Sequence, residues 1–298
     1  MGVCQLLAQR LGRKYRREVN EFLYLMDASY IPLSGRGYDE WTAQSSAFRT
    51  PGLKLHVMTS SDFSTPVVAR VTDTSVGDIT EGRNMPIEAG ATYVFDKGYM
   101  DYAWWHEIHQ KDAFFVTRLK KNSKSITVED RTKASSQECA SILSDKVVRL
   151  ATQRIGGGKP NPFHEQPIRE IWVQRDNDQG PICLATNDFE SAAQHISAHY
   201  KARWGIELFF KWIKQNLQVK RFIGQSKNAV TIQIFTALIA YLLLQLDHFK
   251  VACAVTLKQH KDSVRTRLFQ RPETEYAMRK RRLKEQLKFQ EMQGQLAL

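Results

Sequence analysis

The alternation of apolar and polar residues predicts an α/β protein built on a mixed sheet. Residues 22–27 and 92–96 form short apolar runs that each end in an aspartate, as expected for buried strands. Residues 101–110 carry apolar side chains at helical spacing. The first three predicted strands are close enough for an antiparallel meander, and the strand–helix–strand order that follows predicts a parallel crossover unit. The remaining strands are predicted at residues 52–59, 66–72 and 113–119.

The region after these strands predicts a β-rich insertion. Four short strand-like segments there are separated by turn-rich pieces rather than by helices. A long helix is predicted to begin near residues 189–194, directly after the insertion. The strand-like segments are residues 126–129, 146–151, 168–174 and 182–186.

The predicted long helix carries a narrow polar strip on an otherwise apolar surface. Lys211 lies just beside the strip, and a carboxylate among several cations can hold a metal ion and a phosphate together. The alternative is a ladder of ion pairs between side chains four residues apart on a solvated face. The members of the strip occupy positions i, i+3, i+7 and i+14, within an arc of about 60°: Tyr200, Arg203, Glu207 and Lys214.

The C-terminal part of the chain contains one long apolar segment and a charged tail. Residues 229–246 approach the length of a membrane span, but Gln233 and Gln245 interrupt the run. We therefore expect a buried core helix and no membrane partner. Residues 265–298 are strongly charged, and residues 276–290 are predicted to form a basic, solvated helix.

The charge balance indicates an anionic partner. The chain has 298 residues and a formal net charge of +12, which favours nucleic acid first and a membrane surface second. A soluble basic protein without a polyanionic partner is the alternative. The four cysteines lack the paired spacing of a zinc or redox motif, and the first residues lack the apolar core of a signal peptide. Both observations fit a reducing, intracellular compartment.

Three carboxylates are singled out by their positions. Asp27 and Asp96 end predicted strands, and Glu207 lies on the polar strip. If the two strands are neighbours, both aspartates emerge at one edge of the sheet, where a packed helix can add Glu207. Three carboxylates that close repel one another, and a divalent cation such as Mg²⁺ removes the repulsion and serves phosphoryl transfer. The alternative is that each aspartate is only a turn former or a helix cap.

The polar strip resembles the signature of a known family. Its spacing, Y-x2-R-x3-E-x6-K, is similar to that of bacterial insertion-sequence DDE transposases of the Y-R-E-K group. The resemblance covers about residues 20 to 250. Further segments match in the same order: LMDAS around Asp27, GLKLHV at 52–57, YVFDKGY at 93–99, FFVTRLKKN at 114–122, LATND at 184–188 and RFIGQSKNAVTIQIFTALIAYLL at 221–243.

The resemblance implies an RNase H-like core, with a β-rich insertion before the last catalytic helix. It implies that Asp27, Asp96 and Glu207 are the catalytic triad and bind the metal, Mg²⁺ or alternatively Mn²⁺. The implied reaction is hydrolytic nicking at a transposon end, followed by attack of the freed 3′-OH on target DNA.

The resemblance also implies the partner and its contacts. Tyr200, Arg203 and Lys214 are implied to contact double-stranded DNA near the cleaved phosphate, and Lys211 flanks Glu207 on the same helix face. A homodimer is expected when two transposon ends are paired, and the expected location is the bacterial cytoplasm, in association with the nucleoid.

Five segments follow from the pattern and the resemblance together. The expected parts are a short basic N-terminal remnant at 1–21, the first part of the core at 22–122, the insertion at 123–187, the catalytic and apolar helices at 188–250, and a basic helical tail at 251–298.

The chain departs from the family in two places. Members usually carry a longer N-terminal region that binds the transposon ends, so a truncated copy that inhibits a full-length transposase is one alternative. A metal-dependent DNA nuclease is another.

The second departure concerns a stacking tryptophan. Some relatives place this tryptophan just before the LATND-like strand, where this chain has GPIC at 180–183. We therefore predict no hairpin intermediate, and we expect Trp172 in the core.

Overall fold

The computed structural model describes most of the chain between residues 22 and 269. The described residues are 22–33, 37–38, 41–42, 51–60, 65–120, 123–175, 180–217, 219, 221–251, 255–269, 279–280 and 283–284. The chain forms two compact units, Met1–Leu243 and Leu244–Leu298. The predicted basic helix at 276–290 lies largely outside the described residues.

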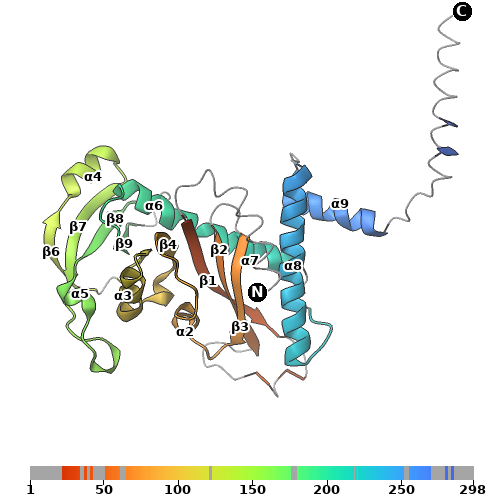
Figure 1. Cartoon of the computed structure of the whole chain (residues 1–298), viewed down its shortest axis with the longest axis horizontal. Coiled ribbons are helices and arrows are strands. Elements are labelled where there is room, and N and C mark those ends of the chain that lie inside the picture. The colour runs from red at the N-terminus through yellow and green to blue at the C-terminus, as the bar shows by residue number, and fades with distance from the viewer. Residues whose placement is uncertain are drawn as a thin grey trace, which may run out of the picture. The chain divides into compact units, whose positions relative to one another are not determined.

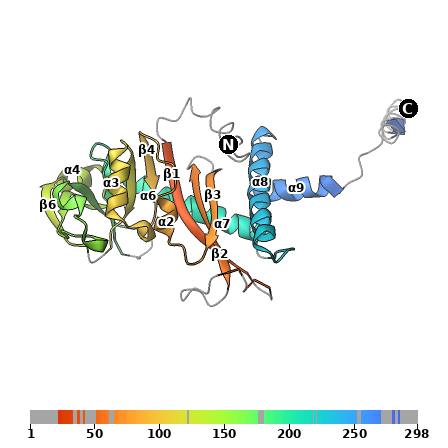
Figure 2. The ribbon, with the colours of Figure 1, turned by 60° about the horizontal axis from the view of Figure 1, so that its bottom comes forward.

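A single mixed sheet organises the first unit (Figure 1). Within the described residues its strand order is β3-β2-β1-β4-β5-β9-β8-β7-β6. β1 is antiparallel to β2 and parallel to β4, and β4 is parallel to β5. Figure 2 shows β1 between β4 on one side and the β2–β3 hairpin on the other. The strands are β1 Phe22–Pro32, β2 Gly52–Ser60, β3 Thr65–Asp73, β4 Ala91–Val94, β5 Phe114–Arg118, β6 Ser125–Asp130, β7 Ile142–Leu150, β8 Ile168–Val173 and β9 Ile182–Thr186.

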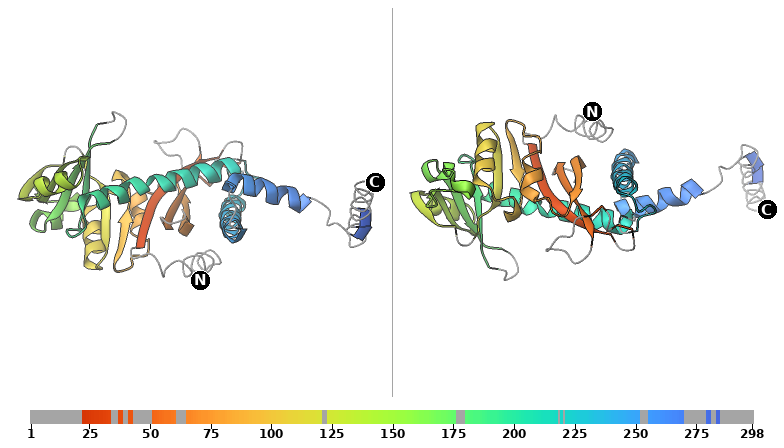
Figure 3. Two further views of the ribbon diagram at one scale, coloured as in Figure 1. Left: turned by 90° about the horizontal axis from the view of Figure 1, so that it is seen from above. Right: turned by 90° about the horizontal axis from the view of Figure 1, so that it is seen from below.

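Helices cover both faces of this sheet. Figure 3 shows α6 and α7 running along one face, with α3 on the other. The described helices are α2 Asp78–Gly82, η1 Lys97–Tyr99, α3 Tyr102–Gln110, α4 Thr132–Glu138, η2 Gly156–Gly158, α5 Pro162–Glu165, α6 Ala193–Ala202, α7 Trp204–Asn216, α8 Lys227–Val251 and α9 Leu257–Phe269.

An aromatic core lies between α3 and the parallel strands. Helical spacing places Trp104, Trp105 and Ile108 on one side of α3, and all three are at most 1% exposed. The Trp105 ring centroid lies 5.0 Å from that of Phe115 on β5, and Phe95 packs 4.8 Å from Trp104. Burial of such large rings supplies much of the hydrophobic stabilisation of this half of the sheet.

The predicted strands and their meander are confirmed, but the end of the first strand is wrong. β1 continues five residues past Asp27, because Ala28–Pro32 keep pairing with Gly52–His56 of β2. Asp27 therefore lies within β1. It still lies beyond the last parallel pair between β1 and β4, Leu25 with Val94.

The predicted insertion is built of strands, and these strands extend the core sheet. β9 pairs antiparallel with β5, and β8, β7 and β6 follow in turn. A buried ion pair joins two of them, since Arg169 Nη2 lies 2.7 Å from Asp145 Oδ2. The same guanidinium donates to the carbonyl of Ser191, just before α6, so the insertion is tied to the start of the helix that follows.

The single long helix predicted after the insertion is instead two helices, α6 and α7, that meet at Arg203. The amide of Arg203 donates to the Tyr200 carbonyl and that of Ile206 to the Arg203 carbonyl, so the turn there is tightened to i→i+3 bonding. Arg203 keeps right-handed helical dihedral angles. The side chains on both sides of the junction therefore remain on the same side of the helix pair.

The apolar helix α8 packs on α7 within the first unit. The Tyr241 ring makes edge contacts with Phe209 and Trp212, at centroid distances of 5.1 and 5.2 Å. Val230, Ile234 and Leu238 are also buried. By length and composition alone residues 227–250 could cross a membrane, with 33% of the apolar window buried. The side of α8 that packs on α7 supports the prediction of a buried core helix, whereas Ile232 and Leu243 are exposed.

Candidate active site

The parallel pairing of β1 and β4 places two aspartates side by side. The register runs from Phe22 opposite Ala91 to Leu25 opposite Val94. Asp27 lies two residues after Leu25, and Asp96 lies two residues after Val94, so the two aspartates are in register with each other. Neighbouring strands lie about 4.8 Å apart, so the two residues emerge together at the carboxyl edge of the parallel strands.

The turn after β4 fixes the position of the Asp96 carboxylate. Asp96 has an extended backbone and caps the short helix η1, where its Oδ1 accepts a hydrogen bond of 2.6 Å from the Gly98 amide. The Thr117 hydroxyl donates to the Asp96 carbonyl from β5. Asp96 is therefore a helix cap, as the alternative reading of the sequence proposed, and at the same time lies beside Asp27.

Helix α7 brings Glu207 to the same edge through Arg203. Arg203 Nη2 donates to Glu207 Oε1 at 2.5 Å, and Arg203 Nη1 lies 3.8 Å from Asp27 Oδ2. Further along α7, Lys214 Nζ donates to Ser29 Oγ at 2.6 Å. Asp27 and Ser29 are two residues apart on β1 and thus share one face of the sheet. The polar strip therefore lies over β1.

The buried position of Asp27 disfavours its charge. Burial raises the pKa of Asp27 from 3.8 to about 6, against the opposing effects of the Ala28 amide and Arg203. The carboxylates of Asp96 and Glu207 raise this pKa further. All three acidic side chains thus lie close enough to repel one another, and added positive charge would stabilise the ionised site.

Tyr200 lies in the same electrostatic environment. Its ring centroid is 5.7 Å from the Arg203 guanidinium carbon. Burial raises the pKa of Tyr200, while Arg203 and Arg118 lower it and Asp96 raises it. Arg118 was missed in the sequence. It lies two residues beyond Val116, which pairs with Val94, so the parallel register alone could have placed it at the edge that holds Asp96.

Lys211 is solvent-exposed, unlike the rest of the strip. No described contact joins it to the three carboxylates or to Arg203. Its role in binding DNA stays a prediction.

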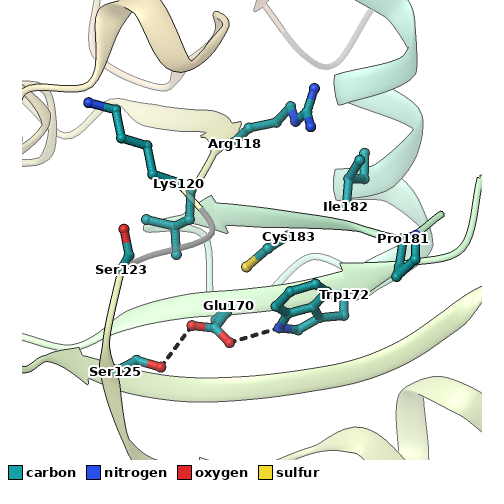
Figure 4. Close-up of a pocket in the computed structure, with 10 residues that line it drawn as sticks. Arg118, Lys120, Ser123, Ser125, Glu170, Trp172, Pro181, Ile182 and Cys183 are labelled. Carbon is teal, nitrogen blue, oxygen red and sulfur yellow. Dashed lines mark hydrogen bonds between the residues drawn. The ribbon is translucent and has the colours of Figure 1, made fainter. Parts of the chain in front are cut away.

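A polar-rimmed pocket begins next to this edge, at Arg118 (Figure 4). Its volume is about 230 Å³. Glu170 accepts hydrogen bonds from the Trp172 indole and from Ser125 Oγ, both at 2.9 Å. Trp172 was expected in the core but is a half-buried wall of the pocket, because the alternation along β8 turns Ile171 and Val173 inward. The pocket is lined by Arg118, Leu119, Lys120, Ser123, Ser125, Glu170, Trp172, Pro181, Ile182 and Cys183.

The donor set of the edge fits a hard divalent cation. Carboxylate oxygens are the preferred ligands of Mg²⁺ and Mn²⁺. The pKa of Asp27 is raised mainly by burial and further by the Asp96 and Glu207 carboxylates, so a cation at this edge would favour the ionised form of Asp27. In the described part of the chain, no three acidic, histidine or cysteine side chains are placed as a group that could hold a metal ion. Arg203 lies between Asp27 and Glu207 and supplies part of the countercharge.

The order β3-β2-β1-β4-β5, with acidic residues at the carboxyl edge and a helix carrying the third, defines an RNase H-like α/β fold. Residues 23–243 match the model of the transposase DDE domain, and the chain belongs to that family. Membership implies a divalent metal cofactor.

Two bacterial proteins that are similar to this chain carry transposase names. The chain is 41% identical over 242 residues to a protein of Sinorhizobium fredii named as transposase y4zB, and the match covers 81% of this chain and 65% of that protein. It is 30% identical to a protein of Geobacillus stearothermophilus named as the transposase of insertion sequence element IS5377, over 80% of this chain and 61% of the relative. The chain thus spans less than two thirds of either relative.

The solved structures that are similar to this chain include a piggyBac transposase synaptic complex with hairpin DNA. The sequence identity is 9% and the TM-score is 0.49, over 86% of this chain and 56% of that one.

Proposed function

We propose that this chain is the catalytic part of an insertion-sequence transposase of the Y-R-E-K group. It would cleave DNA at transposon ends and join the freed end to target DNA. The observation that carries the proposal is the common edge of Asp27 and Asp96, held in one parallel register, with Glu207 linked to Asp27 through Arg203. Membership of the transposase DDE domain family supports the reaction class.

The three carboxylates have the role of metal ligands in this proposal. Asp27, Asp96 and Glu207 would hold Mg²⁺ or Mn²⁺. A bound cation of this kind activates the attacking oxygen and stabilises the leaving oxygen in phosphoryl transfer. The chain's part is to hold the carboxylates in place, through the Gly98 amide for Asp96 and the Arg203 guanidinium for the other two.

The cations and Tyr200 would bind the DNA strand beside the cleaved phosphate. Arg203 lies between two of the carboxylates, and its planar guanidinium can bind a phosphate through two donors. Lys214 of α7 bonds to Ser29 on β1, and Arg118 is the last residue of β5, so a cation lies near each of these strands. Lys211 is exposed and would contact a phosphate further along the strand. The net charge of +12 supports double-stranded DNA as the partner.

The assembly and its location follow from the same proposal. Two transposon ends must be paired for insertion, so we propose a homodimer on DNA. The proposed location is the bacterial cytoplasm, in association with the nucleoid.

A strand-transfer assay separates this function from its two rivals. The assay combines the protein with a pre-cut donor end, Mg²⁺ and a supercoiled target plasmid. Joined donor–target products are expected. Nicked plasmid without joined product would instead indicate a nuclease. Binding without either product would indicate an inhibitor of a longer transposase.

A further inference from the structure

A fourth carboxylate approaches the proposed metal site from the opposite face of the sheet. Asp78 is the first residue of α2, and its side chain is 34% exposed. A methyl group placed on Gly98 would lie 2.8 Å from Asp96 Oδ1 and 3.7 Å from Asp78 Oδ2. The two carboxylates thus border one small space, and the missing side chain of Gly98 keeps that space open.

Asp78 is held from behind by its other oxygen. Lys54 Nζ lies 3.1 Å from Asp78 Oδ1 and also donates to the Val76 carbonyl at 2.8 Å. The lysine side chain is 15% exposed, so this is a partly buried ion pair on β2. The pair fixes Oδ1 and leaves Oδ2 directed to the Gly98 side, where Asp96 lies.

A buried histidine adds an electron-pair donor next to the same carboxylate. His56 is fully buried, and its Nδ1 has no hydrogen-bond partner in the described part of the chain. Nδ1 lies 4.0 Å from Asp78 Oδ1. The other ring nitrogen, Nε2, lies 2.8 Å from Thr72 Oγ1, which also contacts the Asp73 carbonyl. An unpartnered buried nitrogen therefore lies beside the Asp78 carboxylate.

The charge of Asp78 acts on the Tyr99 hydroxyl, as do the charges of Asp27 and Asp96. The buried hydroxyl of Tyr99 has its pKa raised mainly by burial, and then by the charges of Asp78, Asp27 and Asp96. The charges of all three carboxylates therefore act on one buried side chain just after β4.

We propose that Asp78 is a fourth acidic residue of the metal site, which binds the divalent cation together with Asp96 through Oδ2 while Lys54 holds Oδ1. The inference rests on the proposed function, because it requires Asp96 to be a metal ligand. The inference gives Asp78 and Gly98 a role in metal binding. The polar strip alone does not account for the position of either residue.

Metal affinity tests the inference without relying on catalysis. Mn²⁺ binding is measured by electron paramagnetic resonance on the DNA-free full chain, for wild type, Asp78→Asn and Asp96→Asn. The matched control is Asp112→Asn, an exposed aspartate in the turn before β5, at the opposite end of the parallel strands. We expect Asp78→Asn to weaken Mn²⁺ binding about tenfold or more, Asp96→Asn to weaken it further, and the control to match wild type.

The outcomes distinguish this inference from the proposed function. Unchanged affinity in Asp78→Asn, with loss in Asp96→Asn, overturns the fourth carboxylate and leaves the triad standing. Unchanged affinity in both variants contradicts the triad itself.

A second measurement needs no variant, in case Asp78→Asn fails to fold. Fe²⁺ with ascorbate and peroxide cuts the backbone next to a bound metal. Cuts near residues 77–79 as well as 96–98 are expected in the wild-type chain. Cuts near 96–98 without cuts near 77–79 would overturn the inference.

Discussion

At the scale of single residues, the site concentrates negative charge where burial opposes it. Asp27 lies on a strand under a helix, with 22% of its side chain exposed, and its nearest cation is shared with Glu207. Such an arrangement stores unfavourable energy in the metal-free protein and releases it when a cation binds. The expected signature is a pH-dependent stability that depends on Asp27.

Asp27→Asn should stabilise the metal-free protein at pH 7.5 by about 1–3 kcal/mol. The folded-state pKa of Asp27 is raised from 3.8 to about 6, so its ionisation costs stability as pH rises through that window. The advantage of the variant should therefore shrink toward zero near pH 4. Urea unfolding in EDTA at several pH values measures it. A variant less stable than wild type at pH 7.5, or a difference independent of pH, would contradict the assignment.

Lys214→Ala should weaken DNA binding to a similar degree for all sequences. Removing one phosphate contact should make the slope of log affinity against log salt shallower by about one. Fluorescence anisotropy with two unrelated duplexes gives both quantities. Lys111→Ala, at an exposed position after α3, is the matched control and should keep the wild-type slope. An unchanged slope in Lys214→Ala would contradict a phosphate contact. The side chain would then serve only to bind Ser29 on β1.

At the scale of helices and strands, the insertion anchors the catalytic helices as well as extending the sheet. Arg169 on β8 pairs with the fully buried Asp145 on β7 and reaches the backbone before α6. Ser135 of α4 donates to the same carboxylate. One buried charge cluster therefore connects the insertion to the helix pair that carries Glu207.

Arg169→Met should destabilise the fold by about 3–5 kcal/mol, because it leaves the Asp145 charge buried without its partner. Arg149→Met, at an exposed position of β7, is the matched control and should change stability by less than about 0.5 kcal/mol. Chemical denaturation with a far-ultraviolet signal measures both. Equal stability of the two variants would show that the buried pair is dispensable.

Sequence patterns predicted these elements well where a single periodicity dominates. The apolar runs ending at Asp27 and Asp96 predicted two strands, which the structure shows to be neighbours, and the i, i+3, i+7 spacing predicted the face of Glu207. The same patterns did not reveal that β1 continues past Asp27, because pairing with β2 extends it. They could not show that Asp145 and Arg169 are partners, because the sequence does not distinguish two buried, paired charges from two charges on the surface.

At the scale of the whole molecule, the first unit brings together the chemistry of the proposed reaction. Acidic residues from β1, the β4 turn and α7 meet at one edge of the sheet, and cations from α7 and β5 lie on either side. The contribution of Asp78 from α2 depended on tertiary contacts with Lys54 and Gly98 that no local spacing predicts. The five predicted segment boundaries remain a prediction, as does the dimer on paired DNA ends.

Glu207→Gln provides the most direct test of the central claim that Asp27, Asp96 and Glu207 form a catalytic metal site. The substitution keeps the shape of the side chain and removes its charge. Nicking of a transposon-end duplex in Mg²⁺ is measured beside binding of the same duplex in EDTA.

Glu107→Gln is the matched control, since Glu107 is an exposed helix glutamate that also pairs with an arginine, Arg83. We predict that nicking by Glu207→Gln falls at least about a hundredfold while binding stays near wild type and the control keeps both. Nicking at the wild-type rate by Glu207→Gln would contradict the account.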